Sequence, residues 1–331
     1  MKMNKLFLVS LSSILLASCK GQNYFGADKL ILKQTIPLPK VKGRIDHLDI
    51  NLRDKIVYIA ALGNNSLEAA DITQGKLIHS NKGLDEPQGV IFIPQTNEIM
   101  VANGGDGSCR FYNKTSFENT GAVDLGSDAD DVRYDPVDKV IYVGYGSGGI
   151  AIIDPEKHQK TGDVRLSAHP EGFQIDKSLK KIFVNVPGAN QIEVVDLKNL
   201  KVEAKWKTEY GANFPMAIDE TDHIIFIGFR HPAKLVAIDV ATGRTIASAS
   251  LTGDTDDLYY DNSAKKIYAS GGSGAIDIFL FQNPELKHIA RIATRMGART
   301  SFLIPEMQTF VLAERASGGE PAALKFFTLT K

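Results

Sequence analysis

The sequence predicts an all-β protein: a seven-bladed β-propeller with four strands in each blade. Two columns of residues recur with a period near 42, and segments rich in β-branched and aromatic side chains fill each period. A period of about 40 residues built from short strands is typical of propellers, in which each repeat forms one blade. A strand-like segment at the N-terminus, similar to the last strand of the repeats, predicts how the ring closes.

The first column is polar, although an apolar run follows each of its members. Its seven residues are separated by 42, 42, 41, 42, 43 and 43 positions, and they are Asp46, Gln88, Asp130, Glu171, Asn213, Asp256 and Arg299. Each member opens the first, innermost strand of a repeat. We therefore expect the column to encircle one mouth of the axial channel.

The second column is apolar and confirms the repeat. It consists of Tyr58, Met100, Tyr142, Phe183, Phe226, Tyr268 and Val311, which are 41 to 43 residues apart. In the third repeat the four expected strands cover residues 131–134, 140–145, 150–153 and 160–166. The seventh repeat contains only three, at 300–303, 309–313 and 323–329. The segment 30–36 is expected to supply the missing strand, which would leave no open sheet edge.

The N-terminus predicts a targeting signal over residues 1–18. A basic start, Met1–Lys5, precedes an apolar stretch from Leu6 to Leu16 that is too short to span a bilayer. The stretch ends in Leu16-Ala17-Ser18-Cys19, which resembles the lipobox of bacterial lipoproteins and implies acylation of Cys19. The alternative is an ordinary signal peptide with an incidental cysteine. We expect a tether over 19–28, a propeller over 29–331, and a lipid-anchored protein at the periplasmic or outer-membrane face of a bacterial cell envelope.

Charge and cysteine content exclude several classes of protein. With 38 Lys and Arg against 39 Asp and Glu, the chain has no basic stripe, so nucleic-acid binding is not expected. Cys109 has no partner once Cys19 is acylated, which excludes a disulfide framework. We expect a monomer that contacts the membrane only through its anchor.

The second strands of the repeats resemble those of the YVTN-type propeller family. The segments that carry the resemblance are Tyr58–Asn65, Val101–Gly105 and Tyr142–Gly146, with Val194-Val195-Asp196 and Ala237–Gly243 as the typical continuation. The strict Tyr-Val-Thr-Asn tetrapeptide is absent, and Met100–Asn103 and Phe183–Val186 come nearest to it. The resemblance implies a propeller outside the cytoplasm. It implies no single activity, because the same fold serves unrelated functions.

Blade topology brings a set of polar side chains to one face. The connections that enter the first strands and the loops between second and third strands share this face. We predict a ligand-binding mouth there, formed by Asp46, His47, Gln88, Asp130, Asp131, Arg133, Tyr145, His169, Glu171, Asn213, Arg230, Asp256, Asp257 and Arg299. A repeated polar residue can also be purely architectural. We favour function because the members differ in type from blade to blade.

Three functions fit this mouth. The first is binding of a small molecule or a partner protein. The second, by analogy with lactonases and lyases built on propellers, is a metal-assisted hydrolase or lyase acting on a lactone or sugar acid. Its candidate catalytic residues are His47, His169 and Glu171, and its candidate ligands for Ca²⁺ or another divalent metal are Asp46, Asp130, Glu171 and Asp256. The third is a protein-interaction scaffold. The sequence contains no identifiable nucleophile or closed ligand set, which favours binding.

Overall fold

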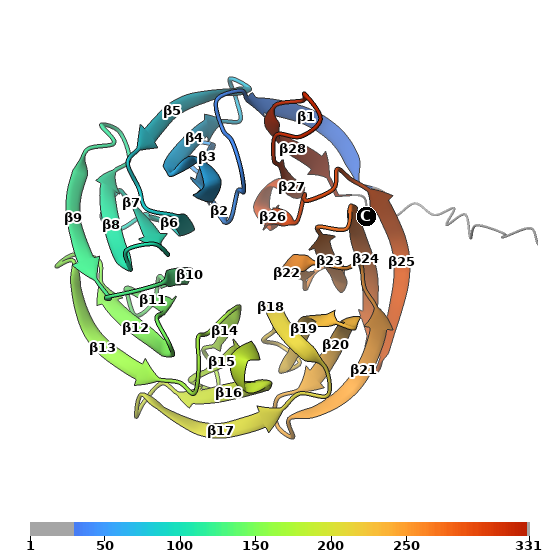
Figure 1. Ribbon diagram of the computed structural model, residues 1–331. Helices are drawn as coiled ribbons and strands as arrows, with labels where there is room; N and C mark the ends of the chain where they lie inside the picture. Colours follow the sequence, from blue (N-terminus) through green and yellow to red (C-terminus); the bar gives the residue numbers. More distant parts are fainter. Residues whose placement is uncertain (1–29, 330–331) are drawn as a thin grey trace, which may run out of the picture.

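The computed structural model describes residues 30–329 and confirms a seven-bladed ring of four-stranded antiparallel sheets (Figure 1). Apart from three short 3₁₀ turns, η1 (Leu62–Asn64), η2 (Pro187–Ala189) and η3 (Pro305–Met307), these residues form no helix. The predicted signal and Cys19 lie outside the described residues.

The first four blades follow one another along the chain. Blade 1 comprises β2 (Leu48–Asn51), β3 (Ile56–Ala61), β4 (Ser66–Asp71) and β5 (Lys76–Lys82). Blade 2 comprises β6 (Pro87–Ile93), β7 (Glu98–Asn103), β8 (Ser108–Asn113) and β9 (Asn119–Asp124). Blade 3 comprises β10 (Ala129–Asp135), β11 (Val140–Tyr145), β12 (Gly149–Asp154) and β13 (Gln159–Arg165). Blade 4 comprises β14 (Phe173–Asp176), β15 (Lys181–Val186), β16 (Gln191–Asp196) and β17 (Lys201–Lys207).

The last three blades complete the ring. Blade 5 comprises β18 (Gly211–Asp219), β19 (Ile224–His231), β20 (Ala233–Asp239) and β21 (Arg244–Ser250). Blade 6 comprises β22 (Thr255–Asp261), β23 (Lys266–Gly271), β24 (Ala275–Gln282) and β25 (Glu285–Ala293). Blade 7 comprises β26 (Thr300–Ile304), β27 (Thr309–Glu314), β28 (Ala322–Thr328) and the N-terminal β1 (Ile31–Leu38).

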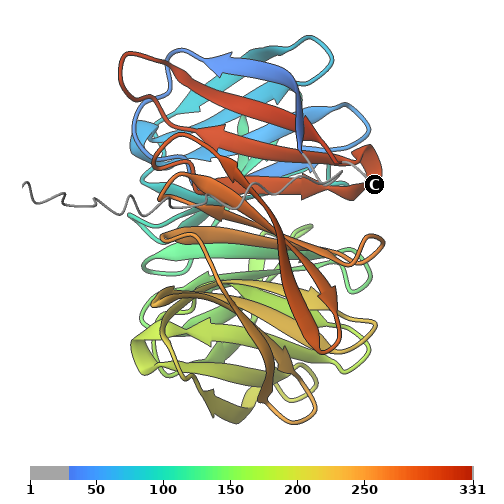
Figure 2. The ribbon, with the colours of Figure 1, turned by 90° about the vertical axis from the view of Figure 1, so that its right-hand side faces the viewer.

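Ring closure follows the prediction, with β1 pairing antiparallel to β28 so that Ile36 lies opposite Leu324. In Figure 1 the first strand of every blade lies nearest the axis, and strands such as β5, β9 and β13 form the outer rim. Figure 2 shows the ring from its side, with hairpins on both faces.

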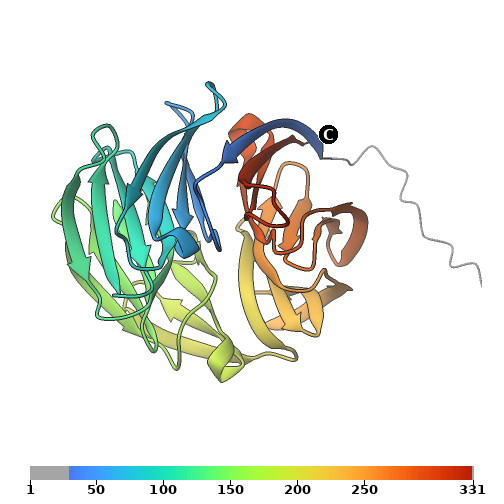
Figure 3. The same cartoon turned by 45° about the horizontal axis from the view of Figure 1, so that its top comes forward.

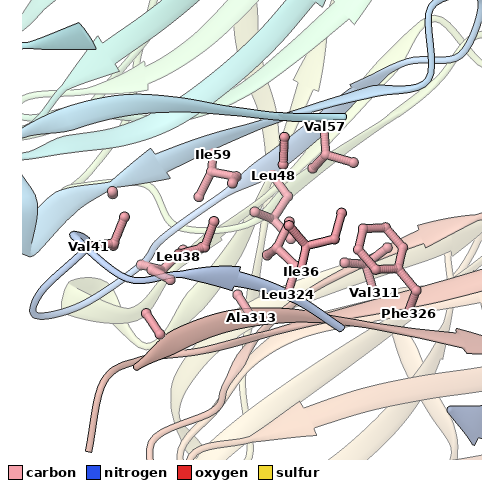
Figure 4. Close-up of a cluster of buried hydrophobic side chains, with 14 of the residues drawn as sticks. Ile36, Leu38, Val41, Leu48, Val57, Ile59, Val311, Ala313, Leu324 and Phe326 are labelled. Atoms are coloured by element: carbon pink, nitrogen blue, oxygen red, sulfur yellow. The ribbon is translucent and has the colours of Figure 1, made fainter. Parts of the chain in front are cut away.

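The hydrophobic core consists of seven separate clusters, because each sheet packs against its neighbours on both faces. Figure 4 shows the cluster between blades 7 and 1, where Ile36 and Leu324 meet Val57. These three side chains are 0 % exposed. Each such burial contributes about 2 kcal/mol, so the closing strand is held by packing as well as by its ladder.

Candidate functional site

The innermost strands enclose a cavity of about 380 Å³ at the axis of the ring. All seven blades contribute to its wall, from Arg44–Asp49 in blade 1 to Phe302 in blade 7. Figure 3, a tilted view, shows how the first strands converge on this axis. The size suits a small molecule, because ligand pockets usually measure about 300–1,000 Å³.

The wall of this axial cavity is dominated by carboxylates. Seven of them line it, namely Asp46, Asp49, Asp130, Asp131, Glu171, Asp256 and Asp257. The basic residues in the wall are Arg44, Arg133 and His47. Carboxylates therefore outnumber the basic groups in the wall by more than two to one.

Some of these carboxylates tie neighbouring blades together. Asp49 accepts a hydrogen bond from the backbone N–H of Phe92 (2.5 Å), and Asp257 accepts one from Ser301 (2.6 Å). Burial raises the pKa of Asp49 and of Asp257 to about 7. Each oxygen joins one blade to the next, as the architectural interpretation of the polar residues predicts.

Asp131 has the same architectural role and is well bonded. Its Oδ2 accepts from the backbone N–H of Phe173 (3.4 Å), and its Oδ1 accepts from Arg133 and from the backbone N–H of Val132 (2.9 Å). The Arg133 guanidinium lies 5.2 Å from the ring centre of Phe173. These contacts fix the wall between blades 3 and 4.

Asp46, His47 and Asp130 form a compact cluster in which one possible ligand atom from each lies within 4.8 Å of the others. Arg44 donates to Asp46 Oδ1 at 2.5 Å. Burial would raise the pKa of Asp46, but His47, whose Nδ1 lies 3.7 Å from Asp46 Oδ2, and Arg44 hold it below its usual value. Burial would also lower the pKa of His47, yet Asp46 and Asp131 raise it.

Tight packing between blades 2 and 3 positions Asp130. A Cβ atom on Gly89 would lie 2.2 Å from the carbonyl oxygen of Asp130, so only glycine permits this approach. Burial is the largest cause of the raised pKa of Asp130, and the charge of Asp46 adds to it.

Glu171 stands apart because its carboxylate has no hydrogen-bond or ion-pair partner within residues 30–329. Burial and the charge of Asp130 raise its pKa to about 8. The nearby His169 does not line the axial cavity. Its Nδ1 lies 2.6 Å from the carbonyl oxygen of Gly146 and 3.3 Å from Asp128 Oδ2, and its pKa is about 9 because Asp130 outweighs burial.

Arginines surround Asp256 at the edge of the axial cavity. Arg230 donates to Asp256 Oδ1 and lies 3.7 Å from the ring centre of Phe214. Arg299 Nε lies 2.8 Å from Asp256 Oδ2, and its Nη1 lies 2.6 Å from Asp254 Oδ1. Arg299 lines a second cavity of about 360 Å³ that shares Arg44 with the first. Arg230 lines neither.

Three of the predicted site residues do not line the axial cavity and form hydrogen bonds outside it. Gln88 donates to Asp128 (3.1 Å), and Tyr145 donates to Asp163 (2.8 Å) near the outer strands of blade 3. Asn213 is 0 % exposed and donates to Asn185 (3.0 Å) and to the carbonyl oxygen of Gln191 (3.1 Å). The structure brings Asp46, His47, Asp130, Asp131, Arg133, Glu171, Asp256 and Asp257 together in one wall.

Two acidic or basic residues of the wall, Arg44 and Asp49, were not predicted from the sequence. Arg44 lies in the connection between β1 and β2, which is longer than the corresponding connections between the other blades. Asp49 lies three residues after the first member of the polar column, whereas Asp131 and Asp257 lie only one residue after theirs. β-Bulges in β10 and β22 shift the inward-facing position, and a bulge has no clear sequence signal here.

No helix within residues 30–329 is long and apolar enough to cross a membrane.

A scan against protein-family models found no match, and a search of curated proteins also found none. Among solved structures, one chain from "Crystal Structure of Mitotic Checkpoint Complex" is similar, with a TM-score of 0.75 and 14% sequence identity. The alignment covers 100% of this chain and 99% of that chain. At this identity the similarity shows the seven-bladed fold, which is compatible with binding small molecules or proteins.

Proposed function

We propose that this chain is a lipid-anchored protein of the bacterial cell envelope, related to the YVTN-type propellers, that binds a small positively charged ligand in its axial cavity. The observation that carries the ligand class is the composition of the wall, seven carboxylates against two arginines and one histidine. Polar groups next to an apolar wall need partners, and a cation supplies them to carboxylates.

Glu171 is the clearest sign of a missing partner. It faces the axial cavity, and no described residue pairs with its carboxylate. Asp131 and Asp257, by contrast, are held by backbone N–H groups of the next blade. Glu171 is therefore free to bind a ligand without giving up a contact that holds the ring together.

The test compares small probes of similar size and different charge. We expect putrescine or glucosamine to raise the melting temperature, glucose to have little effect, and gluconate to have none, because only the amines complement the carboxylates. Thermal-shift measurements and isothermal titration calorimetry check this. Stabilisation by gluconate without stabilisation by either amine would contradict the proposal.

A pair of variants locates the binding. Its pKa of about 8 leaves Glu171 largely protonated at pH 7 in the empty cavity, and a bound cation favours the ionised form. Glu171→Gln keeps the shape of the side chain and cannot ionise, so we expect amine affinity to fall about tenfold, which corresponds to ~1.4 kcal/mol. Glu203→Gln, on the outer strand β17, is the matched control and should bind as the unchanged protein does. Equal affinity in the two variants would place the amine outside the axial cavity.

A further inference from the structure

We infer that Asp46, His47 and Asp130 form a binding site for one divalent transition-metal ion, of the Zn²⁺ or Mn²⁺ class, in the axial cavity. The inference rests on the proposed function, since it names the cation that part of this acidic wall takes. It adds the position of the bound cation and its chemical class.

Geometry provides the first argument. Blade 1 supplies Asp46 and His47 just before β2, and blade 3 supplies Asp130 from β10, so residues about 84 positions apart meet at the axis. Their possible ligand atoms lie within 4.8 Å of one another. Small side-chain rotations would bring them to the separation of roughly 3.4 Å that ligands have around a single ion at about 2.0–2.2 Å.

Unsatisfied polar atoms provide the second, independent argument. Asp46 Oδ2, His47 Nδ1 and Asp130 Oδ1 are buried, and none of them has a hydrogen-bond partner among the described residues. Asp46 Oδ2 and His47 Nδ1 face each other at 3.7 Å, which is too far for a hydrogen bond. The side chain of Asp46 is only 3 % exposed. Such atoms are rare in folded proteins because each costs about 1–3 kcal/mol. One such atom from each of three adjacent side chains indicates a shared partner.

The contacts around the cluster leave one oxygen of Asp46 and one ring nitrogen of His47 available to bind an ion. Arg44 occupies Asp46 Oδ1, so Oδ2 remains for an ion. On the far side of the imidazole, His47 Nε2 lies 3.7 Å from Asp131 Oδ1. At this distance the carboxylate acts on the ring through its charge and not through a hydrogen bond.

The donor set selects the metal. Ca²⁺ and Mg²⁺ prefer oxygen ligands alone, whereas imidazole together with carboxylates suits Zn²⁺, Mn²⁺ and similar ions. Three protein ligands leave at least one coordination position open to the axial cavity. A bound ion would therefore be accessible to a further small ligand there.

The test begins with protein dialysed against a chelator and titrated separately with Zn²⁺, Mn²⁺, Ca²⁺ and Mg²⁺. We expect one Zn²⁺ or Mn²⁺ per chain by calorimetry and elemental analysis, with Ca²⁺ and Mg²⁺ at least tenfold weaker. Co²⁺ should give visible absorption bands of a nitrogen-containing site. Binding of Ca²⁺ as tightly as Zn²⁺ and Mn²⁺ would overturn the assignment.

Variants tie the ion to the cluster. His47→Gln and Asp130→Asn should each weaken Zn²⁺ and Mn²⁺ binding at least tenfold, and His47→Gln should change the Co²⁺ spectrum. Asp128→Asn is the matched control, because Asp128 lies two residues before Asp130 and outside the cluster. It should bind metal within about twofold of the unchanged protein. Unaltered metal affinity in His47→Gln and Asp130→Asn would overturn the inference.

A final arm separates this inference from the proposed function. If chelator-treated protein is stabilised by putrescine or glucosamine but binds neither Zn²⁺ nor Mn²⁺, the metal site is wrong and the acidic binding cavity stands. If neither amines nor metals bind, both proposals fail.

Discussion

Asp131 and Glu171 line the same cavity, but their carboxylates differ in whether the protein supplies them with hydrogen-bond partners. The Asp131 carboxylate is bonded to Arg133 and to backbone N–H groups of blades 3 and 4, whereas that of Glu171 has no partner among residues 30–329. Both are acidic and lie at or next to the start of a repeat, so the sequence could not distinguish them. The distinction depends on bulges and on which backbone group of the next blade comes within reach.

Asp277 in blade 6 shows how a buried carboxylate couples stability to pH. It is 0 % exposed and accepts hydrogen bonds from Arg291 Nε (2.7 Å) and the backbone N–H of Thr252 (2.7 Å). Its Oδ1 lies 2.8 Å from His288 Nε2. Burial alone would raise the pKa of Asp277, but these bonds lower it to about 2.

Asp277→Asn is therefore expected to lower the free energy of unfolding by about 3 kcal/mol at pH 7. Because the pKa is lower in the folded state, the carboxylate stabilises the fold above its ordinary pKa, and this contribution is lost as the pH falls toward 2. Urea denaturation from pH 7 to pH 2.5 should show the two proteins converging at low pH. Asp85→Asn, at an exposed position, should show no such trend, and a difference independent of pH would contradict the role given to ionised Asp277.

At the scale of elements, the repeat made most strands predictable. The segment 30–36 was expected to complete the last blade, and β1 does so over Ile31–Leu38.

One regular feature of the hairpins was not predicted from the sequence. Each hairpin between the first and second strands contains a residue in the left-handed conformation, namely Lys55, Asn97, Lys139, Lys180, His223, Lys265 and Gln308. None is glycine, so tertiary context sets the backbone there rather than local preference.

The closing strand offers a prediction for this scale. Ile36→Ala should lower the free energy of unfolding by about 2–5 kcal/mol, because it opens a cavity in the cluster between blades 7 and 1. Ile31→Ala is the control on the same strand, since Ile31 is 46% exposed, and it should cost less than 1 kcal/mol. Urea denaturation measures both. Equal losses would mean that β1 contributes hydrogen bonds but little packing.

At the scale of the whole molecule, the sequence predicts the blade number and the axial position of the polar residues better than their individual contacts. Asp46, Asp130, Glu171 and Asp256 of the polar column line the axial cavity. Asn213 begins a repeat in the same way, yet it is buried against Asn185. The period specifies where a residue enters its blade, and side-chain direction also depends on β-bulges, which β10, β18 and β22 contain and β2 and β14 do not.

The proposed anchor also concerns the whole molecule. We expect Cys19→Ser to move the protein from the membrane to the soluble fraction and to abolish labelling by radioactive palmitate, because acyl chains hold it at the bilayer. Cys109→Ser is the control, since Cys109 is buried in blade 2 and burial raises the pKa of its thiol. Membrane retention of the Cys19→Ser protein would contradict the anchor.

The pairing of β1 with β28 has a consequence for the time course of folding. The two partners are about 290 residues apart in the chain, a separation that makes this pairing slow compared with formation of a single hairpin. Until that step, β1 and the edge of β28 each expose unpaired backbone groups that fit one another. Two half-folded copies can satisfy the same groups by exchanging their first strands. Crowded chains that have not yet closed are therefore the form of this protein most exposed to domain-swapped assembly.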